Sequence, residues 1–350
     1  MPRILVIRLS SIGDIVHALP AVAALGESLP EAEIGWAVER RFSELLAGNP
    51  FVSRVLPIDT LGWCARWWSA ASPEDVVGGL AALRRFRPDA AIDFQGLVKS
   101  AALGWLSRAP RRIGFAGRWR RERPAGMLYT QRVEAPGREH VVEENLALAE
   151  RLGARPVARE RWQFPLPGDR EAESEIERRL DELRAESFIV INPGGGWTSK
   201  RWPPRQYAAL ARALAEDHTV LVTGSPGEAP WIREIVDSAA GGHAVYFPST
   251  LLEFIALVRR ARMLVGGDTG PLHIAAAAGT PVVAIYGPTN PRRNGPFAPG
   301  DIILTNHTDS ESRRTHWNRM QARRPGYLEG VPTEDVLAAV RRRLAAADGV

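Results

Sequence analysis

Two loops of this 350-residue chain combine glycines with groups that bind phosphates and sugars. The clearest is Gly266-Gly267-Asp268-Thr269-Gly270, which lies between the apolar run 263–265 and an alanine-rich segment, an order typical of a strand, a turn and a helix. Unpaired amides at a helix start attract phosphate or carboxylate, and Asp268 and Thr269 can bind sugar hydroxyls. The alternative is an ordinary turn in which Asp268 or Thr269 caps the helix.

The second loop runs from Asn192 to Pro203 and contains Lys200. It lacks the Gly-Lys-Ser or Gly-Lys-Thr of a P-loop, but exposed amides and an ammonium group can still bind a diphosphate. Of the 45 basic residues only Lys99 and Lys200 are lysines, which favours a requirement for a compact point charge at these positions. The alternative is a glycine-rich hinge loop.

Asp14 is the candidate general base, because it lies on the small-residue turn that follows the apolar run 3–9. A carboxylate in that place could take a proton from an attacking hydroxyl. The alternative is that Asp14 caps a helix beginning at Ile15. His17 and His273 either hydrogen-bond a ligand or are packing residues.

Further candidates lie in the stretch 93–100, Asp93-Phe94-Gln95-Gly96-Leu97-Val98-Lys99-Ser100, at the end of a predicted strand, where open α/β sheets bind ligands. Segment 111–123 carries six arginines, and its glycines and missing apolar period predict a loop. One interpretation is a clamp that binds a polyanionic substrate or an anionic membrane surface. The alternative is a solvated basic loop. Next to Arg66, three tryptophans either touch lipid headgroups or pack in the core: Trp63, Trp67 and Trp68.

Alternating strands and helices are expected to position these loops. The predicted strands are 3–9, 34–38, 54–58, 90–94, 188–191, 219–223, 244–247, 263–265 and 282–286, and the main predicted helices are 98–106, 140–152, 171–184, 205–215, 230–238, 254–260 and 333–346. Two such series predict two parallel-sheet domains, residues 1–160 and 161–330, with a ligand in the cleft between them. The final segment, 331–350, is expected to be a helix that packs back toward the first domain.

The composition is typical of an intracellular globular protein. The net charge of +5 and a pI near 9.8 favour anionic partners, but no nucleic-acid motif accompanies the basic cluster. Cys64 is the single cysteine, so neither an internal disulfide nor a cysteine-based zinc site is expected. The sequence has no apolar run near 20 residues. It also lacks Asp-x-Asp, so no carboxylate pair for a divalent metal is evident.

Several motifs together resemble the lipopolysaccharide heptosyltransferases, glycosyltransferase family 9. They are Arg8-Leu9-Ser10-Ser11-Ile12-Gly13-Asp14-Ile15-Val16-His17-Ala18-Leu19-Pro20, the 93–101 stretch, Lys200-Arg201-Trp202-Pro203, Gly267-Asp268-Thr269-Gly270 and Tyr286-Gly287-Pro288-Thr289. Their order along the chain is also similar to that family. Within it, Gln95 to Ser100 and Arg121-Glu122-Arg123-Pro124 are most similar to heptosyltransferase I.

The resemblance implies a GT-B fold and an inverting, metal-independent glycosyltransferase without a cofactor. It would move heptose from ADP-L-glycero-D-manno-heptose to the Kdo-lipid A inner core, with Asp14 as base and Lys200 neutralising the departing diphosphate. The donor-binding residues would be Gly13, Gly195, Gly196, Thr198, Glu228, Asp268, Thr269, Gly270 and His273. The acceptor-binding residues would be Ser10, Ser11, Gln95, Lys99, Arg120, Arg121 and Arg123.

The same resemblance implies a cytoplasmic monomer, peripheral on the inner membrane, that binds an anionic glycolipid and no nucleic acid. Two departures matter: Gly195 and Gly196 replace threonines of heptosyltransferase I, and Pro271-Leu272-His273 is similar to the wider family. The alternatives are therefore a family 9 transferase with another donor or a later core acceptor, a GT-B sugar-nucleotide epimerase, or, outside enzymes, a nucleic-acid binder.

Overall fold

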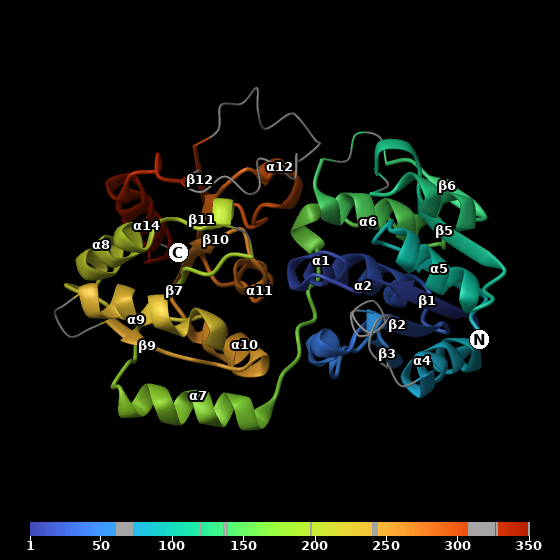
Figure 1. The fold of residues 1–350 in the computed structure, drawn as a ribbon, viewed down its shortest axis with the longest axis horizontal. Coiled ribbons are helices and arrows are strands. Elements are labelled where there is room, and N and C mark those ends of the chain that lie inside the picture. The colour runs from blue at the N-terminus through green and yellow to red at the C-terminus, as the bar shows by residue number, and fades with distance from the viewer. Residues whose placement is uncertain are drawn as a thin grey trace. The chain divides into compact units, whose positions relative to one another are not determined.

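The structure is a computed structural model that describes residues 1–60, 73–119, 121–135, 137, 139–196, 198–239, 244–306, 326 and 328–348. It divides into two compact units, Met1–Pro167 and Gly168–Val350 (Figure 1). The first unit extends past the expected limit at residue 160 because the connecting segment packs on it. Gln163 donates to Glu27 at 2.5 Å, and Asn49 donates to the Pro165 carbonyl at 3.2 Å.

The described residues of the first unit form a parallel sheet in the order β3-β2-β1-β4-β5-β6. Its strands are β1 (Arg3–Ile7), β2 (Glu33–Glu39), β3 (Arg54–Ile58), β4 (Ala90–Asp93), β5 (Arg111–Phe115) and β6 (Gln131–Val133). Its helices are α1 (Ile12–Val16), α2 (Leu19–Ser28), α4 (Pro73–Phe86), α5 (Val98–Leu106) and α6 (Val141–Glu150). The order reverses between β1 and β4, which in open α/β sheets is the place where ligands bind.

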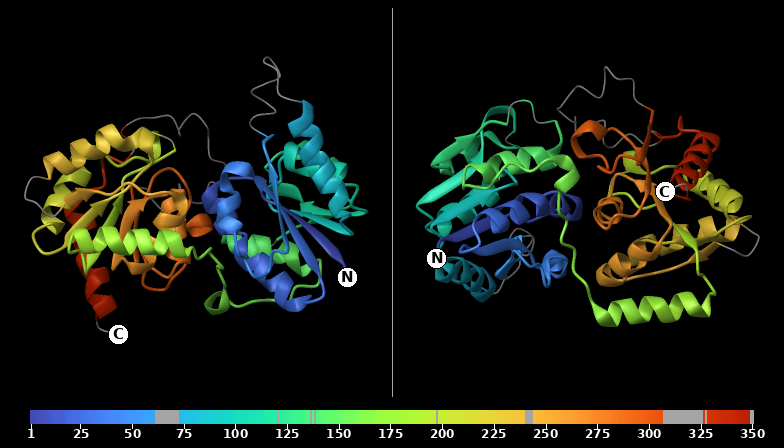
Figure 2. Two further views of the ribbon diagram at one scale, coloured as in Figure 1. Left: turned by 90° about the horizontal axis from the view of Figure 1, so that it is seen from below. Right: turned by 180° about the vertical axis from the view of Figure 1, so that it is seen from behind.

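Apolar residues on alternate sides of β1 account for helices on both faces of this sheet. Leu5 and Ile7 pack in one buried cluster with Phe86 of α4 and Leu103 of α5. The side chains of Ile4 and Val6 therefore point to the opposite face, which α2 and α6 cover side by side (Figure 2). The first sheet is thus a doubly wound, Rossmann-like sheet, as the alternation predicts.

The predicted loop over 111–123 is wrong for residues 111–115, which form strand β5. Ile113 pairs with Ile92 of β4 and Gln131 of β6, and it is fully buried. Pairing with two neighbours outweighs the arginine and glycine content that masked this strand. Short 3₁₀ helices follow at Gly117–Trp119 and Arg123–Leu128.

The second unit repeats this architecture with a parallel sheet in the order β12-β11-β10-β7-β8-β9. Its strands are β7 (Phe188–Asn192), β8 (Thr219–Val222), β9 (Ala244–Tyr246), β10 (Met263–Gly267), β11 (Val282–Tyr286) and β12 (Ile302–Thr305). Its helices are α7 (Arg170–Glu182), α8 (Pro204–Leu214), α9 (Ala229–Ser238), α10 (Leu251–Arg260), α11 (Gly270–Ala277), α12 (Pro291–Asn294) and α14 (Thr333–Asp348). The order reverses between β10 and β7.

Helices α8, α9 and α14 cover one face of the second sheet, and α7, α10 and α11 lie on the other (Figure 1). The C-terminal helix α14, expected to pack back toward the first domain, belongs to the second unit, where Val336 and Val340 join its core. Strand β12 was not predicted from the sequence. It lies at the sheet edge, where Ile302 pairs with Val283 of β11.

Candidate functional site

Asp14 lies one turn beyond the carboxyl end of β1, on the short helix α1. Its Oδ2 accepts from the Ser11 amide at 3.1 Å and from the Ser11 hydroxyl at 3.2 Å. Its Oδ1 forms ion pairs with Arg8 and, at 3.0 Å, with Arg121. The alternative that Asp14 is the N-cap of a helix at Ile15 is wrong in its position, because the helix begins at Ile12 with Ser11 as its N-cap residue. Asp14 still has a capping role, since it is the third residue of that helix and completes a capping box with Ser11.

Arg8 is the partner of Asp14 that the sequence analysis missed as a functional residue. Its side chain is only 2% exposed, and its guanidinium also donates to the Phe94 carbonyl beyond β4. The Arg8 carbonyl accepts from the Trp36 indole at 3.2 Å. The available signal was an arginine directly after a buried strand, since a buried charge needs a partner nearby.

The two arginines determine the charge state of Asp14. Burial of its carboxyl raises the pKa, but the charges of Arg8 and Arg121, with the Ser11 amide and His17, outweigh burial and hold the pKa well below its usual range. Asp14 is therefore ionised at neutral pH and weakly basic. His17 itself is 2% exposed and packs edge to face against His140, as a packing residue would.

Gln95 connects the ends of β1 and β4. Its side-chain Oε1 accepts from the Leu9 backbone N–H at 2.8 Å, and its backbone N–H donates to the Asp93 carboxylate at 2.8 Å. Asp93 also accepts from Ser100 at 2.7 Å and Tyr129 at 2.6 Å. Burial raises the pKa of Asp93, and these hydrogen bonds oppose that rise. Gln95 thus holds the two strand ends at the point where the strand order reverses.

The other predicted acceptor residues of the first unit lie near this edge of the sheet. Lys99 donates to Thr60 at 3.1 Å and lies 3.9 Å from the buried carboxylate of Glu39. Ser11 and Arg123 are exposed, and Ser10 is half-buried. Gly13, the one predicted donor-binding residue of this unit, is buried. Arg120 and the cluster Trp63, Trp67 and Trp68 with Arg66 lie outside the described residues.

Two arginines of the expected basic clamp have structural contacts instead. Arg112 donates to the carbonyls of Leu128 and Ala109, each at 2.8 Å. Arg111 donates to the Arg151 carbonyl at 3.4 Å. Both belong to β5, so any anion-binding role of this segment falls to residues after the strand.

In the second unit, Asp268 is the centre of a buried polar cluster just after β10. Its carboxylate, 3% exposed, accepts from the Lys200 ammonium at 2.5 Å, the Thr289 hydroxyl at 2.6 Å and the Asn294 amide at 3.1 Å. It also lies 3.1 Å from Nε2 of His273. The structure therefore brings together Lys200, Asp268 and His273, which the sequence placed on two separate loops.

The cluster fixes the charge of Asp268 as well. Burial raises its pKa, but Lys200 and His273 together outweigh burial, so that the pKa lies well below its usual range. Tyr286 lies close by; burial first, and then the Asp268 charge, raise its pKa, and its hydroxyl donates to the Asn294 carbonyl at 2.8 Å. Thr289 and Asn294 were not predicted as site residues, because they follow β11 rather than the glycine loops.

Neither Asp268 nor Thr269 caps helix α11, so the ordinary-turn alternative is wrong in this form. Thr269 is the N-cap residue by its backbone, but its side chain makes no capping hydrogen bond and donates instead to the Gly267 carbonyl at 3.3 Å. The positive end of α11 therefore has no capping side chain among the described residues. An anionic ligand is suited to such a helix end.

Two glycines let the Lys200 loop lie directly on the strand ends. A Cβ at Gly287 would lie 2.7 Å from the Ser199 carbonyl oxygen, and one at Gly267 would lie 3.0 Å from that of Lys200. The distance at Gly287 is shorter than real Cβ atoms show, so a larger residue there would force the Lys200 loop to move. The close approach of the 3₁₀ turn Thr198–Lys200 to β10 and β11 is what delivers Lys200 to Asp268.

The remaining predicted donor residues surround this turn. The Gly195 carbonyl accepts from Arg201 at 2.8 Å, whereas Gly196 is exposed with no atom near its Cβ position. Glu228 follows β8, accepts from the Ser225 amide at 2.9 Å, and lies so near Gly194 that a Cβ there would be 2.9 Å from Oε1. Glu228 thus lies beside the loop after β7, at the same sheet edge.

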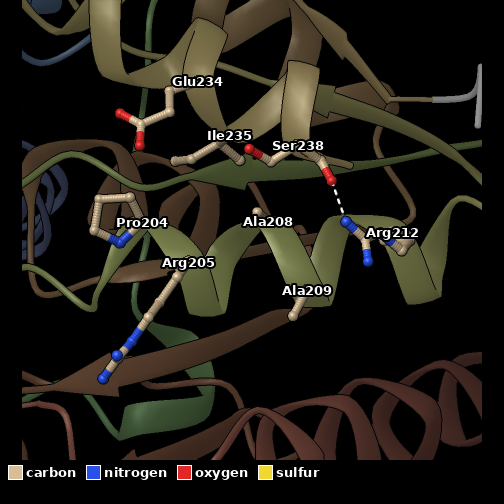
Figure 3. A pocket seen from close by; sticks show the side chains of 8 residues that line it. All are labelled: Pro204, Arg205, Ala208, Ala209, Arg212, Glu234, Ile235 and Ser238. Carbon is tan, nitrogen blue, oxygen red and sulfur yellow. Dashed lines mark hydrogen bonds between the residues drawn. The ribbon is translucent and has the colours of Figure 1, made fainter. Parts of the chain in front are cut away.

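Two cavities of the second unit lie near its loops and helices. One of about 290 Å³ lies between α8 and α9 and has mixed charge, with Arg205, Arg212 and Glu234 in its lining (Figure 3). The other, of about 310 Å³, is lined by Thr198 and Arg201 of the glycine-rich loop and by Trp231 of α9. Thr198 is therefore both a predicted donor residue and part of a cavity wall.

Among the residues that the structure describes, no helix is long and apolar enough to cross a bilayer. Among them, too, no group of three or more histidine, cysteine or acidic side chains is arranged to hold a metal ion.

Comparisons with known proteins agree with this architecture. The model for glycosyltransferase family 9 (heptosyltransferase) matches residues 80–322. Lipopolysaccharide heptosyltransferase 1 of Pseudomonas aeruginosa is 30% identical over 86% of this chain and 83% of its own length. The protein of the same name from Escherichia coli K12 is 28% identical over 86% of this chain and 92% of its own length.

Solved structures show the same fold. A family 9 glycosyltransferase from Veillonella parvula has a TM-score of 0.83 at 20% identity and covers 99% of this chain and 98% of its own. An E. coli heptosyltransferase solved with ADP-2-deoxy-2-fluoro heptose has a TM-score of 0.71 at 25% identity, over 86% of this chain and 92% of its own. The predicted GT-B fold class, with two Rossmann-like parallel-sheet domains, is confirmed.

The family match covers more than half of the sequence, and the relative from Pseudomonas aeruginosa, at 30% identity, matches 86% of it. The chain belongs to glycosyltransferase family 9, the heptosyltransferase family.

Proposed function

We propose that this protein transfers heptose from ADP-heptose to the Kdo-lipid A inner core of lipopolysaccharide. The observation that carries the proposal is its 30% identity over most of the chain to a lipopolysaccharide heptosyltransferase 1. Heptosyltransferases 2 and 3 also match, at 29% and 24% identity, so a later core acceptor is the alternative. The two polar clusters, one in each unit, supply the groups that such a transfer needs.

The second unit is the donor-binding half in this proposal. The uncapped start of α11 and the Lys200 ammonium provide positive charge for a diphosphate, and Glu228 and Thr198 lie at the same sheet edge. An E. coli relative was solved with an ADP-heptose analogue, which supports ADP-heptose as the donor class. Lys200 and the helix amides would neutralise the leaving diphosphate as its charge grows, so the reaction is proposed to be metal-independent.

The first unit is the acceptor-binding half, with Asp14 as general base. Asp14 would take the proton of the acceptor hydroxyl as that oxygen bonds to the anomeric carbon and the bond to the diphosphate breaks. Displacement from the opposite face inverts the anomeric configuration. Lys99, Arg121 and Arg123 are exposed or partly exposed cations suited to carboxylates and phosphates of the acceptor.

A donor screen tests the proposal, because a ligand at 100 times its Kd adds about 2.7 kcal/mol to the stability of the folded state. ADP-heptose should raise the melting temperature on the order of 5–10 °C. ADP-hexoses and UDP-sugars at the same concentration should have a much smaller effect. A shift with UDP-sugars and none with ADP-heptose would contradict the assigned donor.

We also propose that the protein is a cytoplasmic monomer that binds the inner membrane peripherally, through the face formed by α5 and the 3₁₀ helix Arg123–Leu128. Val98 and Trp105 are seven residues apart on α5 and lie on one helix face, 39% and 55% exposed. Met127, 81% exposed, belongs to the 3₁₀ helix that packs on α5. Exposed apolar side chains beside Arg121 and Arg123 match an anionic lipid surface.

Vesicle sedimentation at low salt tests this face. Vesicles containing phosphatidylglycerol should retain the protein, phosphatidylcholine vesicles should not, and Trp105→Ser with Met127→Ser should reduce retention several-fold. Val77→Ser is the matched control, since Val77 is an exposed apolar residue of α4. Failure of anionic vesicles to retain the wild-type protein would refute the membrane proposal and leave the transferase proposal intact.

A further inference from the structure

The carboxylate of Asp14 is fully occupied in this structure. A carboxylate has about four lone-pair sites. The Ser11 amide and hydroxyl donate to Oδ2, Arg121 donates to Oδ1, and the buried Arg8 guanidinium forms an ion pair with the same Oδ1. An acceptor hydroxyl can therefore reach Asp14 only after one of these partners leaves.

The two arginines differ in how easily they can leave. Arg8 is 2% exposed and also donates to the Phe94 carbonyl, so moving it would leave a buried charge unpaired. Arg121 is 42% exposed and contacts Asp14 only through the end of its side chain, at 3.0 Å. Rotation of the Arg121 side chain into solvent is thus the easiest way to uncover Oδ1.

The backbone beside Arg121 is fixed independently of that side chain. The Glu122 amide donates to the Gly96 carbonyl at 3.1 Å, and the Glu122 carboxylate accepts from the Val98 amide at 2.7 Å. The segment therefore stays on the start of α5 while the neighbouring arginine changes its partner. An anionic group of the acceptor could also bind the Arg121 guanidinium in place of the Asp14 carboxylate.

We propose that Arg121 masks the Asp14 base in the enzyme without acceptor, and that an anionic group of the acceptor draws Arg121 away and uncovers the base. Arg8 remains behind as the positioning residue that orients the carboxylate. This inference rests on the proposed function, in which Asp14 takes the acceptor hydroxyl proton. The proton moves to Oδ1, the hydroxyl oxygen bonds to the anomeric carbon, and ADP departs with the electron pair of the broken bond.

Electrostatics support the same assignment. Burial raises the pKa of Asp14, and the Coulombic effects of Arg8, Arg121 and His17 lower it. Removing one arginine from Oδ1 therefore raises the pKa and makes Asp14 a stronger base at the moment when the acceptor arrives. Masking also limits hydrolysis of the donor, because an uncovered Asp14 could activate water as the attacking group.

The test compares Arg121→Gln with Arg123→Gln, which removes the same charge two residues away. A ¹³C NMR titration, with the Asp14 signal assigned by Asp14→Asn, should show a higher Asp14 pKa in Arg121→Gln than in the wild type and an unchanged Asp14 pKa in Arg123→Gln. Donor hydrolysis without acceptor, followed by ADP release, should rise several-fold in Arg121→Gln. Adding free Kdo to the wild-type protein should raise the Asp14 pKa in the same direction.

An unchanged Asp14 pKa and unchanged hydrolysis in Arg121→Gln, with no effect of Kdo on the wild type, would overturn the masking proposal. If Asp14→Asn is inactive at the same time, the transferase proposal stands. If instead Asp14→Asn transfers heptose at the wild-type rate, the base assignment fails, whatever the titration shows.

Discussion

At the scale of residues, two buried or half-buried carboxylates, Asp14 and Asp268, organise the two polar clusters. Each follows a strand at the point where the strand order of its sheet reverses, and each is held ionised by cations. Sequence reasoning found both, because an acidic residue on a glycine turn after an apolar strand is conspicuous. It could not find Arg8 or Asn294 as their partners, because those contacts depend on tertiary structure.

The occupied carboxylate of Asp268 sharpens its expected role. Its carboxylate holds together the side chains of Lys200, Thr289, Asn294 and His273, so in the proposed function Asp268 is expected to position donor-binding groups. Lys200→Met removes the cation and leaves the buried charge with neutral donors. We expect the free energy of unfolding at pH 7 to fall by about 1–3 kcal/mol.

The lowered pKa of Asp268 also makes the stability of the folded state depend on pH. The folded-state pKa of Asp268 is lowered, so its contribution is present above the unfolded value near 3.9 and is lost as the pH falls through the folded value. The free energy of unfolding of the wild type, measured with denaturant, should therefore fall on acidification. In Lys200→Met and in Asp268→Asn it should fall less. An equal fall in the free energy of unfolding in all three proteins would show that the Lys200–Asp268 pair does not cause the pH dependence of stability.

At the scale of elements, the sequence predicted the regular alternation well and the basic segment poorly. The bounds of β3, α5 and β11 agree with the prediction, because residues typical of turns stand close to both ends of each element. Strand β5 was missed because its arginines and Gly114 conceal the buried apolar side chains of Ile113 and Phe115. The helix and strand periodicities report local burial, whereas β5 depends on the strands beside it.

The approach of the Thr198–Lys200 turn to β11 yields a prediction at this scale. Gly287→Ala places a Cβ 2.7 Å from the Ser199 carbonyl oxygen and must push the turn outward. We expect a stability loss of about 1–3 kcal/mol and weaker donor binding, as measured by unfolding and by thermal shift with ADP-heptose. Gly227→Ala, where no atom lies within 4 Å, is the control. Wild-type donor affinity in Gly287→Ala would show that this close approach does not position Lys200.

At the scale of the whole molecule, the two polar clusters belong to separate units with the same architecture. Asp14 and its arginines belong to the first, and Lys200, Asp268 and the start of α11 to the second. The two-domain division was predictable from the repeated alternation of strands and helices. The limit at Pro167 was not, since it depends on the contacts that residues 163 and 165 make with the first unit.

The central claim is tested most directly by heptose transfer to defined acceptors, with product mass and ADP release as readouts. Wild-type protein with ADP-heptose should add one heptose to Kdo-lipid A, with ADP released in equal amount. Asp14→Asn should bind the donor normally by thermal shift yet lose at least about 100-fold in kcat, as expected for loss of a general base. Transfer to an already heptosylated core with none to Kdo-lipid A, or near-normal turnover by Asp14→Asn, would contradict the account.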